Sequence, residues 1–344
     1  MACTNNAARL PFLQSLVAIA DGAVVQGSHG ARSTNNSTAA AVLADPQRRL
    51  AVFGGREGLA RSLASVYACT ISLFLGGLRG VVVRRIATTG RNCISGLAVS
   101  RDGTTVFTAN ASDHAMRAYS VASGELLCAT PGKDYATRPL QFLFPRQLCV
   151  AADDTVLVAD GGHNCIHVVT PRFDTLQLLG KDDALQNPTA VCCDDELVAA
   201  IGGVGHLIVF CRVTGARRLY VDLAAGLKNL AKEHFACLSS MCFWTSRRDV
   251  AFSDFYGGCV FAVSLKGKFL QRIGDAVLRC PQGLACSAFD ELLVADGALR
   301  RLFVFSTAGE LMRTLDCDVT FGCIALHGSS VFAGDGGRSI VEIQ

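Results

Sequence analysis

The sequence has few prolines, few charged residues and no long apolar run. Of its 344 residues only 8 are proline, 18% are charged, and the net charge is +3. So small a basic excess does not indicate nucleic-acid binding, which needs a concentrated basic surface. No segment reaches the roughly 20 consecutive apolar residues of a transmembrane helix, so we expect no membrane association.

The 16 cysteines lack the spacing of a disulfide framework or a zinc motif. No CxxC occurs, and many cysteines lie inside apolar runs such as Leu148-Cys149-Val150 and Cys259-Val260-Phe261. Cysteines in such runs behave as small buried hydrophobes. We therefore expect a reducing compartment and a cytoplasmic location.

The N-terminus lacks a complete targeting signal. Its apolar run, residues 16–20, is short, and one basic residue, Arg9, precedes it. A secretory signal has a longer apolar region, and a mitochondrial presequence has more arginines. An N-terminal targeting segment stays open as the alternative to a cytoplasmic protein.

The sequence does contain an internal repeat. Six equivalent positions, the anchors, follow one another at gaps of 50, 41, 53, 42 and 39 residues. These gaps are centred on the spacing of about 40–45 residues that is typical of propeller blades. An aliphatic residue stands four places before each member, and a small one stands directly before it. This anchor column consists of Asn110, Asp160, Ile201, Asp254, Asp296 and Asp335.

The pattern around each anchor predicts four short strands. Apolar residues stand six and eight places after it, as Ile166 and Val168 do around His167, and this period of two indicates a strand with one buried face. A continuous apolar strand ends at the anchor, a short strand precedes that one, and a glycine-marked turn leads to a fourth strand. We predict an all-β propeller of four-stranded antiparallel blades, because ring closure protects sheet edges.

Two blade numbers fit the sequence. If residues 80–86 supply the missing outer strand of the last unit, the ring has six blades. If residues 12–16 close it instead, residues 39–90 form a degenerate first blade and the ring has seven. We favour seven, because it leaves fewer apolar segments unexplained. The predicted organisation is then a closing strand and flexible polar loop over 1–38 and a propeller over 39–344, with clear repeats over 92–344.

The best-defined units resemble NHL repeats. The resemblance rests on Pro281-Gln282-Gly283-Leu284-Ala285, Leu292-Leu293-Val294-Ala295-Asp296 and Arg301-Leu302-Phe303-Val304-Phe305. The segment from Leu97 to Asn110 is closer to WD40/YVTN-type blades. The resemblance implies the architecture but not one function, because NHL propellers bind proteins or RNA in some families and are enzymes in others.

The recurring aspartates are expected to be structural. A carboxylate that follows a buried strand and precedes glycines accepts backbone N–H bonds in an Asx-type turn. His163 and His167 have a spacing seen in metal ligands, but they fall on a turn and a strand, and no third His or Cys occupies a matching place in a neighbouring unit. We therefore expect no metal, no cofactor and no catalytic group, and no cysteine has a recognisable activating context.

Arginine pairs such as Arg84-Arg85, Arg217-Arg218 and Arg300-Arg301 recur, but they fall on different predicted strands and turns. Scattered pairs do not form one basic surface. RNA binding by an NHL module is therefore an alternative hypothesis, as is a lactonase- or lyase-type propeller enzyme with a divalent metal in its central channel.

The favoured hypothesis is a non-enzymatic, monomeric scaffold that binds a protein partner. Its binding surface would be the face that carries the second-to-third strand turns and the links between blades. Phe255-Tyr256 is the main candidate, because aromatic side chains in loops often anchor interfaces. The residues predicted to lie on this face are His114, Lys133, Tyr135, His163, Lys181, Phe255, Tyr256, Arg300 and Arg338.

Overall fold

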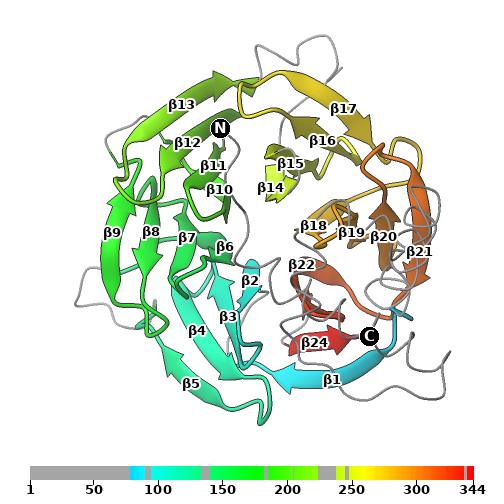
Figure 1. The fold of residues 1–344 in the computed structure, drawn as a ribbon. Coiled ribbons are helices and arrows are strands. Elements are labelled where there is room, and N and C mark those ends of the chain that lie inside the picture. Colours follow the sequence, from blue (N-terminus) through cyan, green and yellow to red (C-terminus); the bar gives the residue numbers. More distant parts are fainter. Residues whose placement is uncertain are drawn as a thin grey trace, which may run out of the picture. The chain divides into compact units, whose positions relative to one another are not determined.

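A computed structural model describes residues 78–89, 94–132, 140–181, 185–203, 205–223, 238–244, 248–336 and 339–344. These residues belong to one compact unit, Leu78–Gln344. They form six four-stranded antiparallel sheets, which follow one another around a ring (Figure 1). The predicted β-propeller is therefore confirmed.

The strands of the first three blades follow the predicted repeat. Blade 1 consists of β2 (Gly96–Val99), β3 (Thr105–Asn110), β4 (Ala115–Ser120) and β5 (Leu126–Ala129). Blade 2 consists of β6 (Pro145–Val150), β7 (Val156–Asp160), β8 (Cys165–Val169) and β9 (Thr175–Leu179). Blade 3 consists of β10 (Pro188–Cys193), β11 (Leu197–Gly202), β12 (His206–Cys211) and β13 (Arg217–Asp222).

The other three blades have the same order, apart from the outer strand of the last. Blade 4 consists of β14 (Leu238–Trp244), β15 (Asp249–Asp254), β16 (Cys259–Val263) and β17 (Phe269–Ile273). Blade 5 consists of β18 (Pro281–Cys286), β19 (Leu292–Asp296), β20 (Arg301–Phe305) and β21 (Leu311–Asp316). Blade 6 consists of β22 (Phe321–His327), β23 (Ser330–Asp335), β24 (Ser339–Ile343) and β1 (Val82–Ala87).

The sixth blade corrects the favoured blade number. β1 pairs antiparallel with β24, with Ile86 opposite Ile340, so the strand that was assigned to a degenerate first blade instead completes the last one. The inner strand β22 lies beside β2, which closes the ring. The seven-bladed prediction is wrong and the six-bladed alternative is confirmed. The proposed closing strand at 12–16, the loop at 27–38 and residues 39–77 of the degenerate blade lie outside the described residues.

The closing strand carries the same turn signal as the other outer strands. Gly80 stands before β1 with a φ of 75°, and Gly267 stands before β17 with a φ of 76°. Glycine adopts this left-handed conformation without the steric cost that other residues incur. This shared signal explains why residues 80–86 already resembled a fourth strand in the sequence.

The core lies between neighbouring blades. The second strands β7, β15 and β19 are buried along their whole length, whereas the outer strand β9 is mostly exposed. Side chains from adjacent sheets share clusters, as Phe107 of blade 1 and Val158 of blade 2 do. The backbone is crowded at Gly334, the small residue before the last anchor: a Cβ there would lie 2.8 Å from Cys323 Sγ and 3.1 Å from Ile94 Cβ.

The cysteines of the described residues are free thiols, and several of them are packed in the core, as predicted. Cys165 and Cys259, for example, are at most 1% exposed. Among the described residues, no helix has the length and apolar character needed to cross a membrane.

Candidate functional site

The turns after the second strands and the links between blades lie on one face of the propeller, which we call the loop face. In an antiparallel four-stranded blade, the second and fourth strands run the same way, so the turn after one and the link after the other share an end. Backbone hydrogen bonds join them: Gly161 N donates to Phe144 O at 3.2 Å, and Gly297 N donates to Cys280 O at 3.1 Å.

The anchor carboxylates hold this face together. Asp160 Oδ1 accepts from the backbone N–H of His163 at 3.0 Å, and Asp254 Oδ1 accepts from Gly257 N–H at 2.9 Å. The predicted Asx-type turns are therefore confirmed. The second oxygen has a further role, because Asp160 Oδ2 accepts from Leu143 N–H at 2.9 Å and so binds the turn to the preceding link.

Blade 5 repeats this arrangement in full. Asp296 Oδ1 accepts from the backbone N–H groups of Ala298 and Leu299, each at 3.0 Å. Its Oδ2 accepts from Arg279 and Cys280 N–H at 2.6 and 2.9 Å. One carboxylate thus fixes a turn and a link at once.

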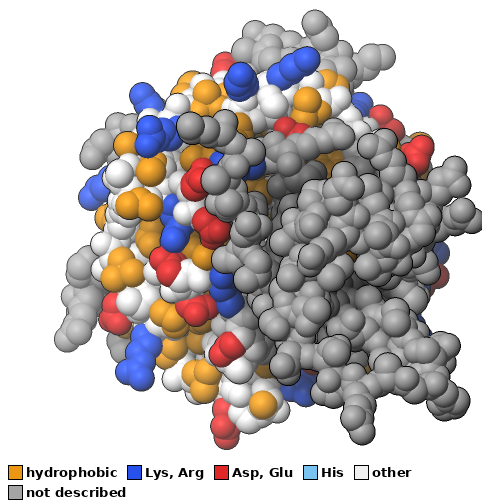
Figure 2. All heavy atoms as spheres, viewed as in Figure 1, with side chains coloured by type: hydrophobic (Ala, Val, Ile, Leu, Met, Phe, Trp, Pro, Cys, Tyr) orange, Lys and Arg blue, Asp and Glu red, His pale blue; other side chains and the backbone are white. Residues whose placement is uncertain are grey.

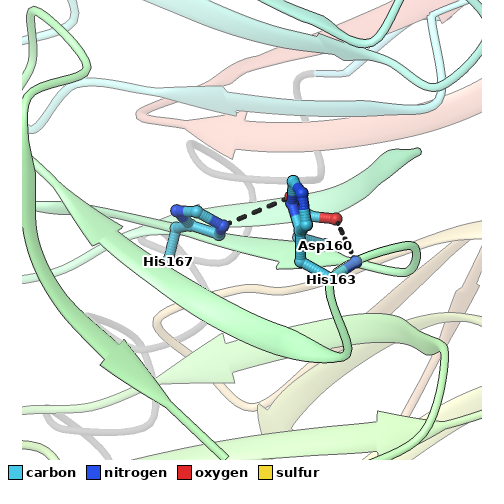
Figure 3. Close-up of side chains that lie close together, drawn as sticks. All are labelled: Asp160, His163 and His167. Atoms are coloured by element: carbon cyan, nitrogen blue, oxygen red, sulfur yellow. Dashed lines mark hydrogen bonds and ion pairs between the residues drawn. The ribbon is translucent and has the colours of Figure 1, made fainter. Parts of the chain in front are cut away.

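Blade 2 adds two histidines to this carboxylate (Figure 3). His163 Nδ1 lies 2.9 Å from Asp160 Oδ2, and His167 Nε2 lies 3.2 Å from the same oxygen. Burial raises the pKa of Asp160, but the adjacent imidazole of His167, together with hydrogen bonds from His163 and Leu143, outweighs it and leaves the pKa below its ordinary value. The site therefore holds a buried negative charge beside two imidazole rings.

A second feature of the loop face is the exposed ring of Phe144. This residue is 46% exposed and has a φ of 57°, a conformation that is unfavourable for a bulky side chain. His114 supports it: Phe144 N–H donates to His114 Nδ1 at 3.0 Å, and the two rings meet edge to face at 4.5 Å. His114, predicted to lie on the binding face, is 7% exposed and acts as a support for Phe144.

The other predicted residues are distributed around the same face. Tyr256 is 70% exposed and meets Phe255 edge to face at 5.0 Å. Arg300 is exposed and pairs with Asp318 at 3.2 Å, and Lys181 is exposed in the link that follows β9. Lys133, Tyr135 and Arg338 lie outside the described residues.

Sequence reasoning missed two members of this face. Nothing in a single sequence indicates that the backbone of Phe144 is left-handed. Asp160 was predicted to be a turn residue only, because a third metal ligand was expected to be a His or Cys of a neighbouring unit. Its place three residues before His163 was the available signal.

Several described arginines form ion pairs with acidic side chains. Arg85 pairs with Asp335 at 2.6 Å, and Arg248 pairs with Glu196 at 2.8 Å. On the part of the described surface that Figure 2 shows, basic and acidic side chains are interspersed. This arrangement agrees with the prediction that the arginine pairs do not make one basic surface.

One thiol lies in an activating environment that the sequence did not reveal. Hydrogen bonding by the Thr214 hydroxyl and backbone, together with Arg218, lowers the pKa of Cys211 to about 6. Most other described thiols have raised pKa values, and burial raises the pKa of Cys323 to about 12. Cys211 ends β12 at the turn to β13, on the face opposite the loop face.

Comparison with known proteins identifies the fold but no family. No protein-family model matches the chain, and no curated protein matches it by sequence. Among solved structures, virginiamycin B lyase from Staphylococcus aureus is 13% identical with a TM-score of 0.53, covering 76% of this chain and 84% of its own. A streptogramin B lyase structure is 12% identical with a TM-score of 0.53, covering 76% and 86%.

The WD40 repeats of RRP9 are similar to the same extent. They are 11% identical with a TM-score of 0.57, and the match covers 77% of this chain and 98% of theirs. Identities this low establish the four-stranded propeller blade alone, in agreement with the NHL- and WD40-like pattern of the sequence.

Proposed function

We propose that the protein is a non-enzymatic scaffold that binds a protein partner through its loop face. The observation that carries the proposal is Phe144, a large aromatic side chain that is 46% exposed on a left-handed backbone. Backbone conformations of this kind persist only where surrounding structure enforces them, and they cluster at functional sites.

The contacts of Phe144 show how the ring is held in place. Its N–H is bonded to His114, its carbonyl accepts from Gly161, and its ring leans on the His114 imidazole. A side chain that is ordered before binding loses little conformational entropy on association. Aromatic residues held in this way serve as the central anchors of protein interfaces.

Tyr256 extends the proposed surface to blade 4. Its ring is 70% exposed and rests on Phe255, so it has little core to fill. The pairing of arginines with acids weighs against RNA as the partner, since phosphate binding needs unpaired positive charge. A protein surface with apolar pockets is the better match to two exposed rings.

The test compares three variants in quantitative affinity capture from cells. Phe144→Ala and Tyr256→Ala each remove an anchor, and we expect the proteins retained by the unmodified chain to be depleted at least tenfold, the change that corresponds to about 1.4 kcal/mol. Val213→Ala is the matched control, because Val213 is 78% exposed in the β12–β13 turn on the opposite face.

Two outcomes would contradict the proposal. If Phe144→Ala and Val213→Ala retain the same proteins as the unmodified chain, the loop face is not the binding surface. If the chain instead retains RNA that is released as salt rises, the partner is a nucleic acid.

A further inference from the structure

His167 places a polar ring where most comparable blades place core hydrophobes. It stands seven residues after the anchor, on β8, and is 6% exposed. The equivalent residues of blades 3, 4 and 5 are Ile208, Phe261 and Phe303, all buried. Histidine at this position gives up apolar packing, so its presence calls for a compensating interaction.

Among the described residues, no hydrogen bond compensates for the apolar packing that is lost at His167. His167 Nδ1 and Nε2 are both buried and have no hydrogen-bond partner. Nε2 does lie 3.2 Å from Asp160 Oδ2, but without the direction of a hydrogen bond. Buried polar atoms in native proteins are almost always satisfied, and an exception requires an explanation such as a bound ion.

The three side chains converge on one point. Asp160 Oδ2, His163 Nδ1 and His167 Nε2 all lie within 4.8 Å of one another. Tetrahedral zinc with bonds of 2.0–2.2 Å requires ligand atoms to be about 3.3–3.6 Å apart, so the 2.9 and 3.2 Å found from each histidine to the carboxylate need only a small outward movement of the ligands. His163 is exposed in a turn and can adjust, whereas Asp160 is fixed by Leu143 N–H.

We propose that Asp160, His163 and His167 bind a divalent transition metal ion, with Zn²⁺ the best match. Two imidazoles and one carboxylate suit zinc and its neighbours, whereas calcium and magnesium prefer oxygen ligands alone. The Leu143 N–H bond to the carboxylate is the outer contact that orients a ligand. Three protein ligands leave the fourth position open.

Blade 1 shows what the same positions hold when no metal is needed. There the residues three and seven places after the anchor are Asp113 and Arg117, which form an ion pair at 3.2 Å. Arg117 supplies its own positive charge beside the acid. In blade 2 both positions are histidine, and their ring nitrogens face the buried anchor carboxylate where blade 1 has an acid–arginine pair.

The experiment titrates the full chain, freed of metal by a chelator, with Zn²⁺ by calorimetry and with Co²⁺ by visible absorption. We expect one ion per chain, with cobalt bands that lack a thiolate charge-transfer band. At a Zn²⁺ concentration about a hundred times Kd, the unfolding midpoint should rise by roughly 4–5 °C.

His167→Phe tests the assignment, because phenylalanine is the residue of blades 4 and 5 at this position. We expect this variant to lose metal binding while its metal-free unfolding midpoint equals or exceeds that of the unmodified chain. His163→Ala should also lose binding, and His206→Ala, a change to a histidine next to Tyr220 in blade 3, should retain it.

The proposal is overturned if the unmodified chain binds no Zn²⁺ or Co²⁺. It is also overturned if His167→Phe and His163→Ala bind as the unmodified chain does. A metal-free His167→Phe protein that unfolds well below the unmodified chain, with no zinc response in either, would show that His167 has a packing role only.

Discussion

Substituting the anchor aspartates with asparagine should separate two kinds of turn that look identical in the sequence. In Asp160→Asn the amide oxygen can still accept from His163 N–H, but the amide NH₂ then faces the Leu143 N–H that Oδ2 accepted at 2.9 Å. The variant loses a hydrogen bond to a charged group and leaves a buried donor without a partner. A hydrogen bond of this kind contributes about 1.5–3 kcal/mol, so we expect a loss of about 3 kcal/mol.

Asp296→Asn should behave in the same way, because its Oδ2 accepts from two link N–H groups. Asp254→Asn is the matched control. Burial raises the pKa of Asp254 despite the Gly257 hydrogen bond, so its charge is unfavourable in the fold, and asparagine keeps an acceptor for Gly257. We expect a change of less than about 1 kcal/mol, as for blade 1, where the anchor is Asn110 and accepts from Asp113 N–H.

The assay is thermal unfolding at pH 7 with a chelator present, so that metal binding does not contribute. For a chain of this size, about 3 kcal/mol corresponds to a fall of roughly 4–5 °C in the unfolding midpoint. The difference between Asp160→Asn and the unmodified chain should also depend on pH. The lowered pKa of Asp160 means that its contribution is complete above the unfolded value of about 3.9 and is lost as the pH falls through the folded value.

Equal losses for all three variants would refute this reasoning, because they would show that the link bonds add nothing to the turn. So would a loss for Asp160→Asn that does not shrink on acidification.

Two further predictions concern the thiol at the β12–β13 turn and the closing strand. At pH 7, Cys211, with a pKa of about 6, should react with iodoacetamide faster than Cys128, because burial raises the pKa of Cys128. Peptide mass spectrometry would measure both rates, and Thr214→Val should slow the reaction of Cys211. Equal rates for the two thiols would contradict the prediction. Ile86→Ala removes a core side chain of β1 that is 4% exposed, and it should lower the free energy of unfolding in urea by about 2–5 kcal/mol. The control Val83→Ala, at a residue that is 51% exposed, should change this free energy little. Equal effects of the two variants would contradict the burial of Ile86 against blade 1.

Most of the fold could be predicted because each blade repeats the same physical requirements. A buried second strand, a small residue before the anchor and a turn glycine recur at fixed offsets, so six copies average out the uncertainty of each. The blade number could not be obtained in this way. It depends on whether β1 pairs with β24, and that contact joins residues about 250 positions apart, so the local signal that marks β1 as an outer strand does not say which blade it completes.

The candidate site likewise contains some features that the sequence predicts and others that it does not. The Asx turns at Asp160 and Asp296 depend on residues a few places apart, and the sequence predicts them. The left-handed Phe144, its support by His114 and the low pKa of Cys211 depend on side chains from separate strands and turns, which one sequence without structure does not place. Asp160 was visible as a turn residue, but its second oxygen faces His167 only because β7 and β8 pair with Asp160 opposite Cys165.

The pairing of β1 with β24 also has a consequence for folding during synthesis on the ribosome. Arg85 is synthesised about 250 residues before its partner Asp335, and at 5–20 residues per second this separation lasts roughly 12–50 s. During that interval β1 is a strand without its sheet, a state that invites pairing with other nascent chains. The adjacent arginines at 84 and 85 are exposed even in the closed ring, and their charge repulsion makes pairing between two copies of β1 unfavourable. The strand whose partner is synthesised last is therefore protected against aggregation by its own charges.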